Sequence, residues 1–330
     1  MTFDEHITQE IVNKEIERHK HWLNRDCEGW EEMRGDFRGH DFTGMDFSNA
    51  DLSFARFEDA TLECDTFRNT NLYGADFTGV IGDSIDFTNV NAEEANFTNA
   101  WLDNTDYSGA NLKNSKFVAA EMNFCNFTKA DMTGVDGHCD PPHDCYEMED
   151  QGLTNDDVKR MRTYFDDCMF AFTKMNGANL KDAFVRNTDF RNAEMNNVNL
   201  HSANLWNSRF KSVTAKNMDI SNTTLDHAKI HDCDFEGVNV KCAEGKYVDF
   251  SNTNLANATF VDARIEYSTF DRTDMTKTNV TSAHIAEATV IDSNFESETS
   301  KNAFCLDAKL IANSNGFVRG ERRPYGQLQR

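Results

Sequence analysis

The sequence predicts an all-β solenoid, a rod in which short strands coil around a filled axis. The first observation is a large apolar residue at every fifth position, as in "GDFRGHDFTGMDFSNADLSFARF". Five is neither the period of a strand nor that of an α-helix, which are 2 and 3.6. The frame holds for 20 consecutive positions from Phe37 to Met132, of which 18 are Phe, Leu, Tyr or Met. A fixed internal period of this kind indicates a repeat architecture.

A second period, of twenty residues, defines the coil. The five-residue frame returns from Met175 to Leu310. Within this second block, Phe occupies positions 190, 210, 250 and 270. Aromatic residues therefore recur at every fourth apolar position. We infer that five residues form one side, that four sides close a ring, and that the rings stack at the strand spacing of about 4.8 Å.

The position two residues before each apolar centre is usually small, as at Ala55 and Ala75. We expect it to share the interior with the centres. Cys125 and Cys233 fall at this position and Cys305 falls at a centre. Since a buried free Cys behaves as a small hydrophobe, the frame predicts that these three thiols are buried and reduced.

The repeating triplets "ADL", "ANL" and "ADF", each followed by two polar residues, resemble the pentapeptide repeat family. Examples are Ala50-Asp51-Leu52, Ala75-Asp76-Phe77 and Ala178-Asn179-Leu180. The resemblance covers residues 35–134 and 173–312. It implies a right-handed quadrilateral β-helix with four repeats in each coil, so the 48 repeats in frame predict about 12 coils in two blocks, 35–134 and 171–312.

Residues 1–34 are predicted to cover the N-terminal end of the rod, because a solenoid needs a cap over its exposed end. Residues 2–24 have the pattern of an amphipathic helix, with Thr2 and Glu5 as a capping box. Four residues fall on one face of this helix: Val12, Ile16, His19 and Leu23.

Residues 135–170 interrupt the repeat and are predicted to form an acidic insertion with a short helix over 154–165. Four possible metal ligands precede that helix: His138, Cys139, His143 and Cys145. Structural zinc sites usually pair ligands as C-x2–4-C and H-x3–5-H. The order here matches only in part, so a polar loop without metal is the favoured interpretation. The insertion residues that are candidates for contact with a partner are His138, Asp140, His143, Asp144, Asp156 and Asp157.

The C-terminal tail, residues 313–330, has four Arg and one Glu, and no apolar helix that could cover the last coil. An uncovered sheet edge invites pairing. Either the tail folds back over this edge, or two rods meet there as a homodimer. The candidates for that contact are Phe317, Arg319, Arg322 and Arg323.

The net charge of −23 is concentrated in the first half of the chain. Residues 1–134 carry −15 and residues 135–170 carry −7, whereas residues 171–310 carry only −4 and the tail carries +3. Such acidity disfavours direct binding of nucleic acid or of a small anion and favours a basic partner. No segment has the apolar run of a signal peptide or of a membrane span, so a cytoplasmic location without membrane contact is expected.

One side of the first block is predicted to carry a line of acid. Glu63, Asp83 and Asp103 each follow a centre and are twenty residues apart, so they should stack one strand spacing apart. Like charges on neighbouring strands destabilise a sheet, and neutralising all three is therefore expected to keep or raise the melting temperature. The further candidates for partner contact are Trp101 and Phe124 near this line, and Asp46, Asp86 and Asp106 on a second face. Ile81 is expected to point outward, unless a shift at Gly82 turns it inward.

The sequence contains no nucleophile elbow, P-loop, dinucleotide fingerprint or HExxH motif, and a rod with a filled axis has no interior pocket. We therefore expect a non-enzymatic protein without cofactor. The resemblance implies a function like that of the quinolone-resistance members of the family, which imitate DNA and occupy the DNA-binding surface of topoisomerases. This chain is longer, has a larger insertion and concentrates its charge in the N-terminal half, so the partner need not be a topoisomerase. The segment "HKHWLNRDCEGWEEMRG" resembles lead-in segments of some phage and bacterial pentapeptide proteins. If it indicates a phage origin, a host defence nuclease or another DNA-binding enzyme is an equal candidate for the partner. The alternative is a scaffold or adaptor in which the insertion and the tail bind other proteins.

Overall fold

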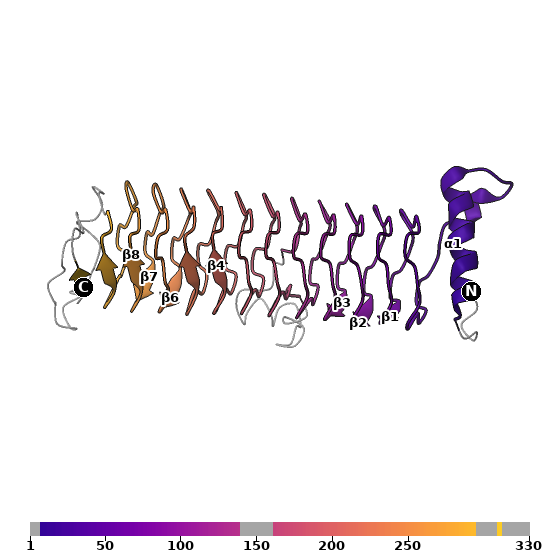
Figure 1. Ribbon diagram of the computed structural model, residues 1–330, viewed down its shortest axis with the longest axis horizontal. Helices are drawn as coiled ribbons and strands as arrows, with labels where there is room; N and C mark the ends of the chain where they lie inside the picture. Colours follow the sequence, from indigo (N-terminus) through magenta and orange to yellow (C-terminus); the bar gives the residue numbers. More distant parts are fainter. Residues whose placement is uncertain (1–6, 139–160, 295–308, 312–330) are drawn as a thin grey trace, which may run out of the picture.

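A computed structural model describes residues 7–138 and 161–294, together with the backbone of residues 309–311. The chain forms a rod whose coils stack along the long axis, with helix α1 lying across one end (Figure 1). The architecture is a right-handed β-solenoid, so the fold class predicted from the five-residue period is confirmed. Among the described residues, no helix has the length and apolar character needed to cross a lipid bilayer.

The helix at the end of the rod is α1, Gln9–Asn24, followed by the 3-10 helix η1, Trp30–Glu32. Thr8, rather than Thr2, is the N-cap, and its hydroxyl accepts a hydrogen bond from the backbone N–H of Ile11. The predicted capping box of Thr2 and Glu5 lies outside the described residues. Val12 and His19 are fully buried, which confirms the predicted face of the helix and its role as a cap.

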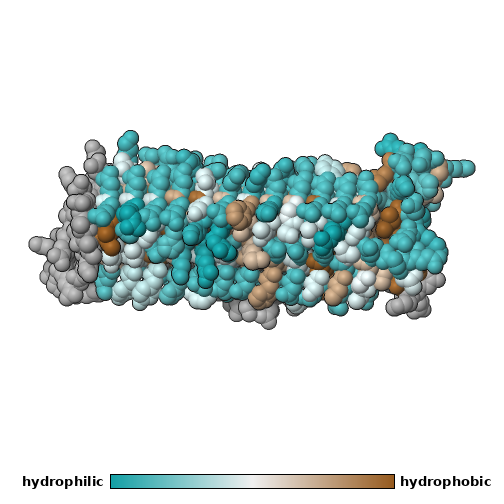
Figure 2. Space-filling model, in the orientation of Figure 1, coloured by the Kyte–Doolittle hydropathy of each residue, from teal (hydrophilic) through white to brown (hydrophobic). Residues whose placement is uncertain are grey.

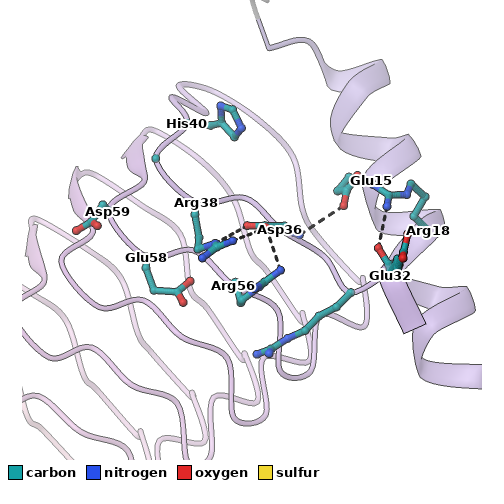
Figure 3. A pocket seen from close by; sticks show the side chains of 11 residues that line it. Glu15, Arg18, Glu32, Asp36, Arg38, His40, Arg56, Glu58 and Asp59 are labelled. Carbon is teal, nitrogen blue, oxygen red and sulfur yellow. Dashed lines mark hydrogen bonds and ion pairs between the residues drawn. The ribbon is translucent and has the colours of Figure 1, made fainter. Parts of the chain in front are cut away.

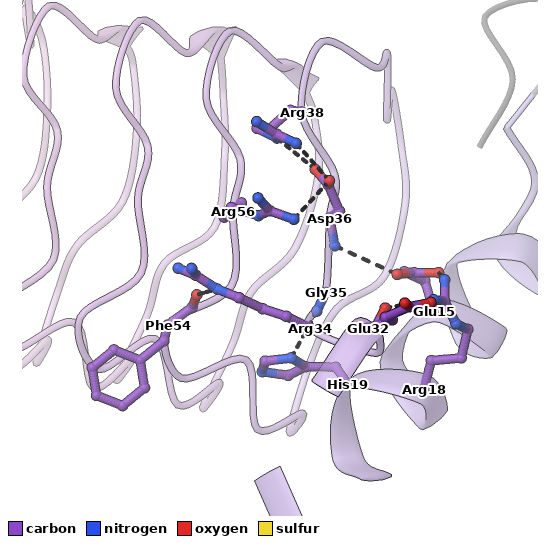
Figure 4. A network of polar contacts seen from close by, with 10 residues as sticks. All are labelled: Glu15, Arg18, His19, Glu32, Arg34, Gly35, Asp36, Arg38, Phe54 and Arg56. Atoms are coloured by element: carbon purple, nitrogen blue, oxygen red, sulfur yellow. Dashed lines mark hydrogen bonds and ion pairs between the residues drawn. The ribbon is translucent and has the colours of Figure 1, made fainter. Parts of the chain in front are cut away.

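Hydrogen bonds fasten this cap to the first coil (Figure 4). The Gly35 backbone N–H donates to His19 Nδ1 at 2.9 Å, and His19 Nε2 lies 3.0 Å from the Ser53 carbonyl oxygen. Burial lowers the pKa of His19 to about 4, so the ring is neutral, with Nε2–H as the donor to Ser53. Arg34 Nε donates to the Phe54 carbonyl oxygen at 2.6 Å.

The coils are joined by parallel backbone pairing between residues twenty positions apart. Along one side of the rod, bridges connect Asp36 to Arg56, Asp76 and onward as far as Asn279. Where the pairing extends over three residues, it forms ten short strands within the described part of the chain, in the sheets β1-β2-β3, β4-β5, β6-β7 and β8-β9-β10. Their bounds are Thr61–Glu63 (β1), Ile81–Asp83 (β2), Trp101–Asp103 (β3), Arg209–Lys211 (β4), Lys229–His231 (β5), Glu244–Lys246 (β6), Arg264–Glu266 (β7), Thr269–Asp271 (β8), Thr289–Ile291 (β9) and Lys309–Ile311 (β10).

The axis is filled by the predicted apolar centres, which stack on one another. Phe57 stacks on Phe37 and on Phe77 with ring centroids 4.6 and 4.7 Å apart. Cys125 and Cys233 are buried as predicted, and Cys305 lies outside the described residues. At Gly82, a Cβ would come within 2.2 Å of the Leu62 carbonyl oxygen, and Ile85 fills the adjoining space. Ile81 is 57% exposed, so the frame does not shift there.

The corners of the coil need a backbone that turns into the left-handed region. The second residue after a centre has a positive φ, as at Asn49 (φ 60) and Asn69 (φ 58). Asn tolerates this conformation better than most residues, which explains the many Asn residues at this position. Phe124 occupies the same position with φ 59 and is 60% exposed. A bulky side chain is unusual in this region.

The predicted insertion, 135–170, is too wide at both ends. Asp136 pairs with Lys116 before it and with Asn179 after it, and Phe165 and Phe170 are buried in the core. The solenoid therefore continues to residue 138 and has resumed by residue 163. Phe165 and Phe170 are two further centres. The solenoid has about 10 turns, so the coil count differs slightly from the 12 predicted. Because Asp136 and Asn179 are 43 positions apart instead of 20, the insertion adds 23 residues to one coil.

The helix predicted over residues 154–165 is wrong in its last part. Tyr164 lies in a backbone bridge with Glu121 and Phe184, and Phe165 is a centre of the solenoid. Residues 154–160 lie outside the described residues. The physical reason is that the centre at Phe165 pairs with the coils on both sides, and this pairing requires an extended backbone.

Candidate protein-binding face

The predicted line of acid is present on the outward side of β1, β2 and β3. The strands pair in register, so that Glu63 lies beside Asp83 and Asp83 lies beside Asp103. We call these three residues the acidic column. Neighbouring members are one strand spacing apart, about 4.8 Å. The predicted stacking is confirmed, whereas the binding role of the column stays a prediction.

Two large apolar side chains lie next to the acidic column. Ile81 and Trp101 come two residues before Asp83 and Asp103, and alternate residues of a strand point to the same side. Ile81 is 57% exposed and Trp101 is 51% exposed. Figure 2 shows that the visible surface is mainly hydrophilic, with a group of hydrophobic residues near the middle of the rod. The strand register and the exposure of Ile81 and Trp101 place acid and exposed apolar surface together on β1–β3.

Hydrogen-bond donors compensate two of the three carboxylates. Ser84 Oγ and Asn104 Nδ2 donate to the two oxygens of Asp83, each at 2.6 Å, and these bonds hold the pKa of Asp83 below its ordinary value. Asp103 accepts from the Asn123 backbone N–H at 2.8 Å and from Trp101 Nε1 at 2.9 Å. The sequence led us to expect that neutralising the column would leave the melting temperature unchanged or raise it. These contacts do not fit that expectation, because hydrogen-bond donors offset the repulsion between the carboxylates.

We therefore expect Asp83→Ala to lower the free energy of unfolding by about 1 kcal/mol, since two hydrogen bonds between coils or within the turn are lost. Glu63→Gln should change it by less than about 0.5 kcal/mol, as is usual for an exposed surface substitution. Urea unfolding followed by circular dichroism measures both. A gain in stability from Asp83→Ala would show that repulsion dominates after all.

The second predicted acidic face has mainly a structural role. Asp46, Asp86 and Asp106 each come just before a centre, and one oxygen of each accepts the backbone N–H two residues later, at 2.8, 2.9 and 2.8 Å. Arg68 also pairs with Asp86 at 2.5 Å. These Asp residues close turns of the coil, and much of the acid of the first block therefore belongs to the repeat itself.

The face continues beyond the insertion. This continuation was not predicted from the sequence. Trp101 bridges to Glu121, Glu121 to Tyr164, and Tyr164 to Phe184. Tyr164 and Phe184 stack with ring centroids 4.9 Å apart. The available signal was the five-residue frame itself, which can be followed backward from Met175 to Phe170 and Phe165.

The other predicted contact residues are only partly described. His138 is half-buried, and its Nδ1 lies 2.6 Å from Asp136 Oδ1. Asp140, His143, Asp144, Asp156 and Asp157 of the insertion, the possible metal ligands Cys139 and Cys145, and the tail residues Phe317, Arg319, Arg322 and Arg323 lie outside the described residues. Within the described ranges, the ligand atoms of His21, Asp26 and Cys27 lie within 4.8 Å of one another. His21 Nδ1 and Asp26 Oδ1 already lie within hydrogen-bond distance, at 2.7 Å.

A groove between α1 and the first coils is lined by charges of both signs (Figure 3). Asp36 pairs with Arg38 at 2.7 Å and with Arg56 at 2.9 Å, and Arg18 pairs with Glu15 at 2.7 Å. Because the charges largely satisfy one another, the groove offers no excess of cations to an anionic ligand. The charged residues that line the groove help to hold the cap on the first coils.

The geometry defines a class of protein: a β-solenoid whose axis is filled by packed side chains. A family model described as pentapeptide repeats (8 copies) matches residues 34–63, 70–106, 95–134, 168–207 and 246–296. These segments make up more than half of the chain, and the chain belongs to the pentapeptide repeat family.

Several solved structures are similar to this chain. HetL, a pentapeptide repeat protein involved in heterocyst differentiation regulation from the cyanobacterium Nostoc sp. strain PCC 7120, is 12% identical over 95% of each chain, with a TM-score of 0.34. QnrB1, a plasmid-mediated fluoroquinolone resistance protein, is 16% identical over 68% of this chain and 90% of its own, with a TM-score of 0.34. No curated protein sequence matches this chain.

Proposed function

We propose that the protein is a non-enzymatic binding rod whose acidic half imitates duplex DNA and occupies the DNA-binding surface of an enzyme, such as a topoisomerase or a defence nuclease. The observation that carries this proposal is the acidic column on β1–β3, beside the exposed Ile81 and Trp101. A basic surface that binds phosphates is the natural complement of such a face.

The charge density of the first block supports the proposal. Residues 35–134 contain 17 Asp and Glu against six Lys and Arg, a net charge of −11 over five coils. Five coils at the strand spacing extend about 24 Å, which gives one net negative charge per about 2.2 Å. Duplex DNA has one per about 1.7 Å. The coils of residues 161–294 carry 18 Asp and Glu against 14 Lys and Arg, so the first block is the part that resembles DNA.

The test has two stages, beginning with capture of a partner from cells on the immobilised protein. Duplex DNA and added salt should both release this partner, and the protein should inhibit the partner's own binding to DNA. The triple variant Glu63→Gln, Asp83→Asn, Asp103→Asn should bind the partner at least tenfold more weakly. A control triple variant, Asp59→Asn, Glu93→Gln, Glu94→Gln, removes the same charge from other sides of the rod and should change the affinity by less than twofold.

The adaptor hypothesis predicts that partner binding depends on the insertion, and the coil geometry allows the insertion to be deleted without breaking the repeat. Deletion of residues 139–161 removes 23 residues and restores the twenty-residue period between Asp136 and Asn179. If this deletion abolishes partner binding while the triple variant binds normally and DNA does not compete, the insertion carries the specificity and the DNA-mimic proposal fails.

A further inference from the structure

A shallow groove lies on the same face, between the coil of β3 and the coil that resumes after the insertion. It is lined by Asn99, Trp101, Glu121, Arg162, Tyr164 and two alanines. The backbone bridges put Trp101, Glu121 and Tyr164 in three successive coils. The groove is therefore a junction that exists only because the two blocks form one continuous solenoid.

The chemistry of the groove suits a cation. Trp101 and Tyr164 supply aromatic rings on either side of the Glu121 carboxylate, and Asn123 Nδ2 donates to Glu121 Oε1 at 3.0 Å. Burial, followed by the nearby charge of Asp103, raises the pKa of Glu121, so a bound cation would relieve an unfavourable environment. Aromatic rings beside a carboxylate are favourable surroundings for an ammonium or guanidinium group.

The arginines closest to the groove are already engaged. The Arg162 guanidinium lies over the Phe184 ring at 5.1 Å, and Arg186 lies over the same ring at 5.0 Å. Arg186 also forms an ion pair with Asp166. Both guanidinium groups therefore lie against Phe184, and Arg186 is also paired with Asp166. Arg162 lines the groove, but among the described residues neither arginine forms an ion pair with Glu121.

We propose that this groove receives an arginine or lysine side chain from a basic helix of the partner protein, and that the helix then lies along the acidic column; the proposal rests on the function proposed above. From Glu121 to Glu63 there are three coil steps, about 14 Å, which a helix covers with about nine residues. A helix with cations on one side can therefore place one of them in the groove and others against Asp103, Asp83 and Glu63.

Charge complementarity favours a basic partner, rather than the insertion of this chain, as the occupant of the groove. Residues 139–160 carry seven Asp and Glu against two Lys and Arg, and this segment does not complement an acidic column. A basic helix does, and basic helices are common on surfaces that bind DNA.

The experiment uses the intact protein and a fluorescein-labelled 16-residue peptide with Arg, Lys and Leu at helical spacing, with fluorescence anisotropy as the readout. Trp101→Ala and Glu121→Gln should each raise the Kd at least tenfold. Two matched controls should change it by less than twofold: Trp206→Ala, which removes another exposed Trp of the rod, and Glu244→Gln, which lies in the same column of residues as Glu121. A peptide of the same composition in scrambled order should bind at least tenfold more weakly.

Three results would overturn the inference: equal losses in the control variants, equal binding of the scrambled peptide, or a tenfold gain in affinity on deletion of residues 139–161, which would identify the insertion as the occupant of the groove. Thermal unfolding of each variant separates loss of binding from loss of fold. If the peptide experiment refutes the groove, the DNA-mimic proposal still stands as long as DNA displaces the captured partner. Peptide binding without competition by DNA would support the groove and refute the mimicry.

Discussion

Phe77→Ala is expected to lower the free energy of unfolding by about 3–5 kcal/mol, the usual loss for truncation of a buried Phe. Phe77 is fully buried and stacks between Phe57 and Phe97, with ring centroids at 4.7 and 5.0 Å. Since the coils on both sides of Phe77 consist of packed centres, the cavity has little room to collapse. Urea unfolding followed by circular dichroism measures the loss.

The matched control is Asp76→Ala, one residue away and pointing outward. The Asp76 carboxylate accepts the Thr78 backbone N–H at 3.0 Å and the Thr78 hydroxyl at 2.6 Å. Loss of these part-buried hydrogen bonds should cost about 0.5–1.5 kcal/mol. Equal losses at the two positions would contradict the assignment of inward and outward residues on which the whole fold depends.

Asp65→Asn is expected to stabilise the protein above pH 7, which is unusual for a substitution in a core. Asp65 is 1% exposed and occupies the interior position two residues before the centre Phe67. Its Oδ1 accepts the Met45 backbone N–H at 2.5 Å. Its Oδ2 is buried and has no hydrogen-bond partner among the described residues.

The occupants of equivalent positions show what this position requires. The Thr70 hydroxyl donates to the Phe47 carbonyl oxygen at 2.7 Å, and Thr188 donates to that of Phe165 at 2.9 Å. In each pair the acceptor lies 23 residues earlier. A carboxyl group at position 65 can donate in this way only when it is protonated.

The sign of the pH dependence follows from these contacts. Burial raises the pKa of Asp65 to about 7, whereas an unfolded chain has an Asp pKa of about 3.9. The folded state therefore holds the proton more tightly. The contribution of Asp65 to stability is most favourable below about pH 4 and is lost progressively as the pH rises to about 7, an effect on the order of 4 kcal/mol.

In Asp65→Asn, the side-chain carbonyl keeps the bond from Met45 while the amide supplies a donor without ionising. The free energy of unfolding should rise by about 2–4 kcal/mol at pH 8, by about 1 kcal/mol at pH 5, and change little below pH 4. Urea unfolding at several pH values compares the variant with the parent. Asp59→Asn, at an exposed position, serves as the control and should show no such gain. Parallel pH profiles for the parent and Asp65→Asn would refute the prediction.

The local sequence predicted the coil but not the limits of the insertion. The centre at Phe77 and the small residue at Ala75 follow a five-residue period that neighbouring repeats along the sequence display. Phe165 and Phe170 obey the same frame, yet the acidic and polar residues before them favoured their assignment to the insertion. Their place became evident through pairing with coils on either side, such as the bridge of Glu121 to Tyr164.

The candidate site was predicted only in part: the stacking of its carboxylates was predicted, but their hydrogen bonds and the place of Tyr164 were not. The stacking of Glu63, Asp83 and Asp103 follows from their spacing of twenty residues, and the strand register confirms it. The hydrogen bonds that compensate Asp83 and Asp103 could not be inferred from spacing, because they depend on how side chains of adjacent turns are oriented. Tyr164, which completes the groove with Trp101, was missed with the rest of its coil.

By itself the sequence determined the repeat, the filled axis, the cap and the half of the rod that carries the acid, because each of these follows from the type of residue at a fixed period. Only the tertiary structure decided which carboxylates are partnered and where the two blocks join. Both depend on contacts between residues 20 positions apart, or 43 across the insertion. Such contacts form only when one coil stacks on the next, so no single repeat contains them.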